Sequence, residues 1–134
     1  MRSITETITI DARPDDVHAF VASAERLPSW AIGFAKAIRR DGDDWLVTLG
    51  SGTELPIRLD VDGETRTVDF VLMPAPGAEA VVPSRVVPNG EGAEYLFTMF
   101  QTPDLSDALF EQQAAELRPE LTVLKAHVES SCPL

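Results

Sequence analysis

The hydrophobic pattern of this chain changes its period near residue 101, and this change constrains the fold most. From residue 34 to residue 101, apolar side chains recur at every second position and are interrupted by turn sequences such as Asp62-Gly63. From residue 106 to Glu129, apolar side chains recur at three- and four-residue spacing. The first pattern is typical of antiparallel strands and the second of one long helix. Because a lone sheet leaves an apolar face uncovered, we expect an α+β fold with the helix packed on the sheet.

The residues before this region indicate a strand and two short helices. Residues 4–10 are rich in Ile and Thr, which favours a strand. Pro14 is followed by two aspartates, which is typical of the first turn of a helix. A second short helix or turn is expected at residues 27–30. The predicted order is one strand, two short helices, about six antiparallel strands and one long helix, so the sheet has about seven strands.

Three motifs resemble the START-like (SRPBCC) helix-grip superfamily, which includes polyketide cyclase/dehydratase-type proteins. Residues 8–20 read Ile-Thr-Ile-Asp-Ala-Arg-Pro-Asp-Asp-Val-His-Ala-Phe, and residues 27–30 read Leu-Pro-Ser-Trp. Residues 121–129 read Leu-Thr-Val-Leu-Lys-Ala-His-Val-Glu, with a Leu-Lys-x-x-x-Glu ending. The resemblance implies one helix-grip domain over residues 1–134, with a curved antiparallel sheet wrapped on the long C-terminal helix. It also implies an elongated apolar cavity between sheet and helix.

The charge and the hydrophobic content exclude several kinds of partner. The chain has 134 residues, a net charge of −11 and 44% hydrophobic residues. Nucleic acid is not an expected partner, because binding to phosphates needs clustered Lys and Arg. No segment approaches the roughly 20 apolar residues that a membrane span needs, so we expect no membrane insertion. No basic stretch followed by an apolar run opens the chain, so we expect a cytoplasmic protein.

The sequence contains no motif for a cofactor, a metal or a catalytic nucleophile. The run Gly50-Ser51-Gly52 lacks the Lys-Ser/Thr of a phosphate-binding loop, and no Gly-x-Ser-x-Gly occurs. The two histidines, His18 and His127, and the one cysteine, Cys132, show no spacing of metal ligands. We therefore expect no cofactor and no metal. His18 lies off the apolar stripe of its helix, so it is expected to be solvated.

Arg85 is the charged residue whose direction matters most for function. It follows Pro83, which interrupts the two-residue alternation, so the pattern leaves open whether Ser84 or Arg85 faces inward. An inward Arg85 would orient a carboxylate or enolate of a ligand, whereas an outward one would pair with an acid. The acids Glu54, Asp60 and Asp69 fall on outward registers of their strands.

Nine residues are candidates to contact a ligand. They are large apolar side chains on inward registers or on the stripe of the terminal helix, Trp30 from the second short helix or turn, and Arg85 and Tyr95 as polar groups. They comprise Trp30, Trp45, Leu59, Phe70, Arg85, Tyr95, Phe97, Leu117 and Leu121. The same apolar residues are also suited to packing a core, and the sequence does not divide these two roles.

The leading hypothesis is a module that binds or carries an apolar or aromatic small molecule, including a lipid, in the cavity. The first alternative is a cyclase/dehydratase-type enzyme acting on a polyketide-like or other hydrophobic substrate. Its first suspects are Arg85 with Tyr95, or His127, and the sequence identifies no catalytic residue. The second alternative is a non-enzymatic partner protein. A homodimer formed through an edge strand is compatible with the sequence.

Overall fold

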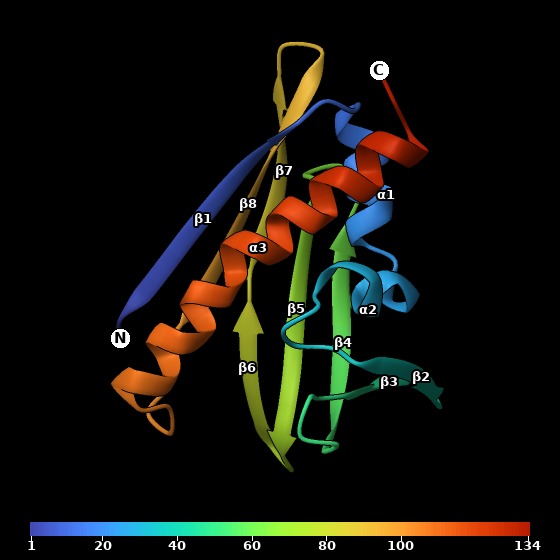
Figure 1. The fold of residues 1–134 in the computed structure, drawn as a ribbon. Coiled ribbons are helices and arrows are strands. Elements are labelled where there is room, and N and C mark those ends of the chain that lie inside the picture. Colours follow the sequence, from blue (N-terminus) through green and yellow to red (C-terminus); the bar gives the residue numbers. More distant parts are fainter.

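The computed structural model describes all residues, 1–134, and has eight strands and one long helix, α3, that crosses a face of their sheet (Figure 1). The strands are β1 (Ser3–Ile10), β2 (Ala37–Asp41), β3 (Asp44–Thr48), β4 (Glu54–Asp62), β5 (Thr67–Ala75), β6 (Ala78–Val82), β7 (Ser84–Asn89) and β8 (Gly92–Phe100). The helices are α1 (Pro14–Val21), a 3₁₀ turn at Ala24–Arg26, α2 (Leu27–Trp30) and α3 (Asp107–Ser131). This is the predicted α+β helix-grip fold. No helix has both the length and the apolar composition needed to cross a membrane.

The sheet is antiparallel throughout and has one strand more than expected. Its order is β1-β8-β7-β5-β4-β3-β2, and β6 pairs with β5 beside β7. The extra strand arises at Pro83, which divides the predicted strand 79–87 into β6 and β7. Proline has no N–H to donate to a ladder, so pairing changes partner there. The carbonyl of Pro83 still accepts a hydrogen bond of 3.0 Å from the Thr98 N–H.

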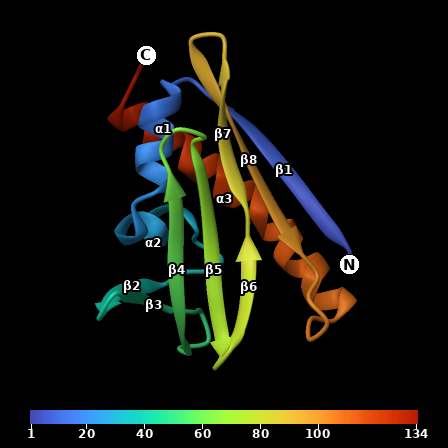
Figure 2. The same ribbon diagram turned by 180° about the vertical axis from the view of Figure 1, so that it is seen from behind.

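Helix α3 covers the face of the sheet as the apolar stripe predicted. Its N-cap is Ser106, whose Oγ accepts a hydrogen bond of 3.2 Å from the Leu109 N–H. Seen from behind, the strands β4 to β8 lie in front of the helix (Figure 2). Its inward side chains Leu121, Leu124 and Val128 are fully buried. The C-terminal half of α3 therefore packs directly on the core.

Polar contacts fix the C-terminal half of α3 to the end of β1. Lys125 Nζ donates to the Thr9 carbonyl at 2.8 Å and to Glu129 Oε2 at 2.6 Å. The same Glu129 oxygen accepts a bond of 2.8 Å from the Asp11 N–H. The Leu-Lys-x-x-x-Glu motif of the sequence thus joins the last helix to the first strand.

Helix α1 corrects the prediction for His18. This residue was expected to be solvated, but its side chain is buried and its Nε2 lies 3.1 Å from the Thr67 carbonyl oxygen. The reason is that α1 contacts β5, β7 and β8, as well as α3. These neighbours bury a wider face of the helix than the stripe of Val17, Phe20 and Val21 alone.

Candidate functional site

A cavity of about 730 Å³ lies between the sheet, the loop after α2 and the N-terminal half of α3. Fourteen of its 21 lining residues are hydrophobic. The volume and the apolar lining are within the range of small-molecule sites in proteins. The apolar lining residues from the strands are Leu55, Ile57, Phe70, Leu72, Val82, Phe97 and Met99, and Leu49 directly follows β3.

The cavity exists because the N-terminal half of α3 does not fill the space above these strands. In this half the helix presents Gln112, Gln113 and Glu116 toward the cavity, with Leu117 as the first fully buried leucine. Amides and carboxylates are not packed into an apolar core without partners. These polar side chains therefore border the cavity and do not fill it. In the C-terminal half of α3, leucine side chains fill the corresponding space between helix and sheet.

An aromatic cluster forms one wall of the cavity. The ring of Trp30 lies edge-on to Phe70 at 6.3 Å and to Tyr95 at 6.5 Å between centroids, and Phe70 lies 6.0 Å from Phe97. Such contacts hold the rings in fixed orientations. Trp30 is 2% exposed, and its Nε1–H has no hydrogen-bond partner. A buried donor without a partner costs free energy, so this N–H does not stabilise the fold.

Glu120 and Glu116 form the polar end of the cavity. They are one helical turn apart on α3, and both line the cavity. Glu120 is 9% exposed, and its Oε2 accepts a hydrogen bond of 3.1 Å from the Gly33 N–H. Glu116 lies against the same glycine, because a Cβ added at Gly33 would lie 2.8 Å from Glu116 Oε2. Two carboxyl groups therefore meet the loop after α2.

The surroundings of Glu120 raise its pKa from the usual 4.5 to about 7. Burial is the main cause, and the negative charge of Glu116 adds to it. Hydrogen bonds from the backbone of Gly33 and Phe34 oppose the rise. Near neutral pH the group exchanges a proton readily, so it has the property of a general acid or base in an apolar site. No three His, Cys, Asp or Glu side chains gather as ligands for a metal ion.

Four of the nine candidate residues line this cavity together. They are Trp30 from α2, Phe70 from β5, Phe97 from β8 and Leu117 from α3. Each comes from a different element, and together they span both the sheet and the helix. Their role as ligand contacts remains a prediction.

Two of the candidates lie in the core behind this wall. Leu121 and Tyr95 are fully buried, and neither lines the cavity. The Tyr95 hydroxyl has no hydrogen-bond partner, and burial raises the pKa of this group. The nearby Ser84 hydroxyl donates its hydrogen to the Val68 carbonyl at 2.6 Å, and it opposes the rise less than burial causes it. These two residues support the cavity wall from the side away from the cavity.

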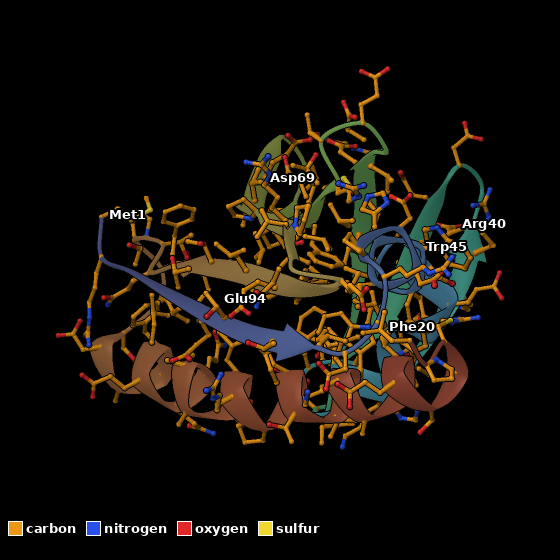
Figure 3. The ribbon with its side chains drawn as sticks, turned by 90° about the horizontal axis from the view of Figure 1, so that it is seen from above. Met1, Phe20, Arg40, Trp45, Asp69 and Glu94 are labelled. Carbon is orange, nitrogen blue, oxygen red and sulfur yellow. The ribbon has the colours of Figure 1, made fainter.

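Trp45 and Leu59 lie on inward registers but beside a different, smaller hollow. This hollow has a volume of about 380 Å³ and is bordered by residues 22–25 after α1. The Arg40 guanidinium carbon lies 4.9 Å from the centre of the Trp45 ring, at the end of the sheet formed by β2 and β3 (Figure 3). The two residues border the smaller hollow together with residues of the 3₁₀ turn, and neither is among the residues that line the larger cavity.

Arg85 requires a correction. Its side chain is exposed and donates to the Thr65 carbonyl oxygen at 3.3 Å, whereas Ser84 is 5% exposed and faces inward. After the break at Pro83, β7 begins on the inward register, so Ser84 and Val86 are buried. Arg85 therefore cannot orient a carboxylate in the cavity, and the best support for an Arg85–Tyr95 catalytic pair is removed.

The acids of the strands lie outward, as expected. Glu54 is exposed and pairs with Arg39 at 3.0 Å, and Asp60 pairs with Arg58 at 2.9 Å. Asp69 lies opposite Asp60 in the sheet register, on the side of the sheet away from α3 (Figure 3). None of these three carboxylates contributes to the cavity.

Glu120 and Glu116 were missed from the sequence, although a signal for one of them was present. Glu120 is three residues after Leu117 and four before Leu124, so it stands within the apolar stripe of α3. A carboxylate on the buried face of a helix is unusual and marks a candidate site. The loop at Gly33, which gives this carboxylate its partner, has no such pattern.

The sequence matches one family model, and several solved structures have a similar fold. The family described as polyketide cyclase / dehydrase and lipid transport matches residues 1–129. No curated protein sequence matches the chain. Among solved structures, the protein XoxI from Bacillus cereus is similar with a TM-score of 0.76 and 18% identity, over 96% of each chain. A START superfamily protein from Mycobacterium smegmatis has a TM-score of 0.70 and 14% identity, over 96% of this chain and 97% of that one.

A further similar structure is the di-domain ARO/CYC BexL from the BE-7585A biosynthetic pathway. It has a TM-score of 0.74 and 21% identity, and the match covers 96% of this chain and 47% of that chain. At these identities the three structures support the shared fold alone.

Proposed function

Since the chain belongs to the polyketide cyclase/dehydrase and lipid transport family, we propose that it binds a predominantly apolar small molecule in the cavity between the sheet and α3. The observation that carries this proposal is the cavity of about 730 Å³ with its mostly hydrophobic lining. An apolar space of this size is costly to leave unfilled, and burying a ligand there is favourable.

The aromatic wall and the polar end would give such a ligand an orientation. Burial of roughly 100 Å² of apolar ligand surface contributes about 2.5 kcal/mol before ordering costs. The fixed rings of Trp30, Phe70 and Phe97 limit those costs, because they lose little freedom on binding. The carboxyl groups of Glu116 and Glu120 supply the polar contacts.

Val82 and its neighbour Val81 provide a matched test of this function. Val82 lines the cavity, whereas Val81 is 42% exposed on the opposite side of β6. We expect V82F to reduce binding of the neutral dye N-phenyl-1-naphthylamine by about tenfold or more, because the added ring occupies ligand space. V81F should bind the dye like the unchanged protein. Equal binding by all three proteins, with similar unfolding midpoints, would overturn the proposal.

A second candidate function is proton-transfer catalysis of the cyclase/dehydrase kind, which the position of Glu120 favours. A carboxyl group with a pKa of about 7 in an apolar cavity is suited to take a proton from a carbon atom. Glu116 would keep Glu120 protonated in part and ready to donate the proton back. In this assignment Glu120 is the general base and acid, and the aromatic wall holds the substrate.

The base strength of Glu120 can be tested with a simple reagent that needs no specific recognition. In 5-nitrobenzisoxazole, a base removes the proton on the ring carbon beside nitrogen, the N–O bond breaks, and a cyano-nitrophenolate forms. We expect the protein to accelerate this reaction, with a rate that rises with pH through about 7 as Glu120 ionises. E120Q should lose the acceleration while it still binds the neutral dye. An unchanged rate in E120Q would overturn the catalytic assignment and leave ligand binding intact.

A further inference from the structure

The charged groups of the cavity all have the same sign. Of its 21 lining residues, Glu116 and Glu120 carry charges, and no Lys, Arg or His is among them. The remaining polar side chains are those of Ser51, Gln112 and Gln113, apart from the indole of Trp30. This is the reverse of a site for fatty acids or phosphates, which needs a cation or a ring of N–H groups for the anion.

The basic residues near the cavity do not line it. On α3, Arg118 donates to the Thr7 carbonyl, and Lys125 bonds to Thr9 and Glu129. At the rim, the exposed Lys36 has its Cε 3.6 Å from the place where a Cβ of Gly50 would lie. Lys36 is not among the lining residues, and its ammonium group forms no ion pair with either glutamate. No positive charge therefore balances the two carboxyl groups inside the cavity.

A ligand with a negative group would face repulsion at this end of the cavity. Interactions between charges are strong in an apolar, partly dry space, because solvent screens them poorly. A carboxylate placed beside Glu116 and Glu120 would be the third negative charge there. An ammonium group would instead offset the electrostatic repulsion between the two carboxylates, and its N–H groups would donate hydrogen bonds to their oxygens.

On this basis we propose that the ligand of the cavity is an apolar amine, whose ammonium group lies between Glu116 and Glu120 and whose apolar part lies against the Trp30–Phe70–Phe97 wall. The proposal rests on the proposed function, since it names the chemical class that the same cavity selects.

Three probes with the same chain and different head groups separate this proposal from the proposed function. They are decylamine, decanol and decanoate, measured by calorimetry at about pH 8 and about 0.15 M salt. Under these conditions the amine is charged and Glu120, with a pKa of about 7, is mostly ionised. We expect decylamine to bind about tenfold or more tightly than decanol, and decanoate to bind least.

Variants of single glutamates distinguish binding of the amine in the cavity from its general attraction to the negatively charged protein surface. E120Q and E116Q should each weaken decylamine binding about tenfold more than they weaken decanol binding, because a Gln amide still forms a hydrogen bond to a hydroxyl group but carries no charge for an ammonium group. The control is E91Q, which removes the same charge from an exposed turn and should leave all three affinities unchanged. Equal or stronger binding of decanoate, or equal loss in E91Q and E120Q, would overturn the amine proposal while decanol binding keeps the proposed function. Absence of binding by all three probes would overturn the proposed function itself.

Discussion

The backbone N–H of Gly33 donates a hydrogen bond of 3.1 Å to Oε2 of Glu120, and this contact joins the loop after α2 to the helix that spans the sheet. It fixes a carboxyl group at the polar end of an apolar cavity. The loop can lie this close to α3 because Gly33 has no side chain that would contact Glu116.

The stability of the protein should depend on the ionisation of Glu120. Its folded-state pKa of about 7 is above the usual 4.5, so the folded protein holds this proton more tightly than the unfolded chain. The contribution of Glu120 to stability is therefore present below pH 4.5 and is lost as pH rises through 7. As pH rises from 4.5 to 7, the unfolding free energy of E120Q should therefore increase by on the order of 2 kcal/mol relative to that of the unchanged protein. Urea unfolding at a series of pH values measures this difference, and parallel curves for the two proteins would contradict the assigned environment of Glu120.

Gly33 should tolerate a side chain only when Glu116 is shortened. An added Cβ would lie 2.8 Å from Glu116 Oε2 and 3.3 Å from Glu116 Cβ, so the Glu116 carboxyl group must turn away and the loop must shift slightly from the helix. We expect G33A to lose about 1 kcal/mol of unfolding free energy, and E116A to restore most of it. The control is G63A, because a Cβ at Gly63 meets nothing within 4 Å. The same loss from G33A with and without Glu116 would show that the two residues are not coupled.

The Tyr95 hydroxyl should contribute nothing to stability. It is fully buried without a hydrogen-bond partner, so its removal abolishes an unsatisfied polar group and leaves the ring in place. We expect Y95F to be as stable as the unchanged protein or more stable by about 1 kcal/mol. Thermal and urea unfolding check this expectation. A clear loss of stability in Y95F would mean that the hydroxyl has a partner in solution.

Glu129 should stabilise the protein only while it is ionised. Its bond to Lys125, and then that from the Asp11 N–H, lowers the pKa of this carboxyl group. The stabilisation is therefore present above the usual carboxyl pKa and is lost as pH falls through the lowered one. We expect E129Q to lose about 1 kcal/mol at neutral pH and to match the unchanged protein in strong acid. If the neutral-pH loss persists in acid, the Lys125–Glu129–Asp11 contact is not its cause.

The fold followed from the sequence because its signals were local and repeated. The two-residue period of residues 34–101, the cap at Ser106 and the stripe through Leu117 and Leu124 each predicted an element that the structure contains. The one missing strand has a local cause as well. Pro83 was recognised as a break, but its effect on pairing depends on β5 and β8, which lie beside it only in the folded sheet.

The site followed from the sequence only in part, because the cavity depends on where α3 crosses the sheet. Trp30, Phe70 and Phe97 line the cavity, whereas Trp45 and Leu59 occupy the same kind of register and lie beside another hollow. A register fixes the face of a sheet but not the position along it. The homodimer and the cytoplasmic location remain predictions.

Occupation of the cavity by an apolar molecule is tested most directly by a two-dimensional proton–nitrogen NMR spectrum recorded during titration with decanol. The chain has two tryptophans, Trp30 at the cavity wall and Trp45 outside it, so their indole N–H signals report on the two places separately. We predict that saturating decanol shifts the Trp30 indole signal and the Gly33 amide signal and leaves the Trp45 indole signal in place. Unchanged Trp30 and Gly33 signals at saturation, or a shift of Trp45 alone, would contradict binding in this cavity.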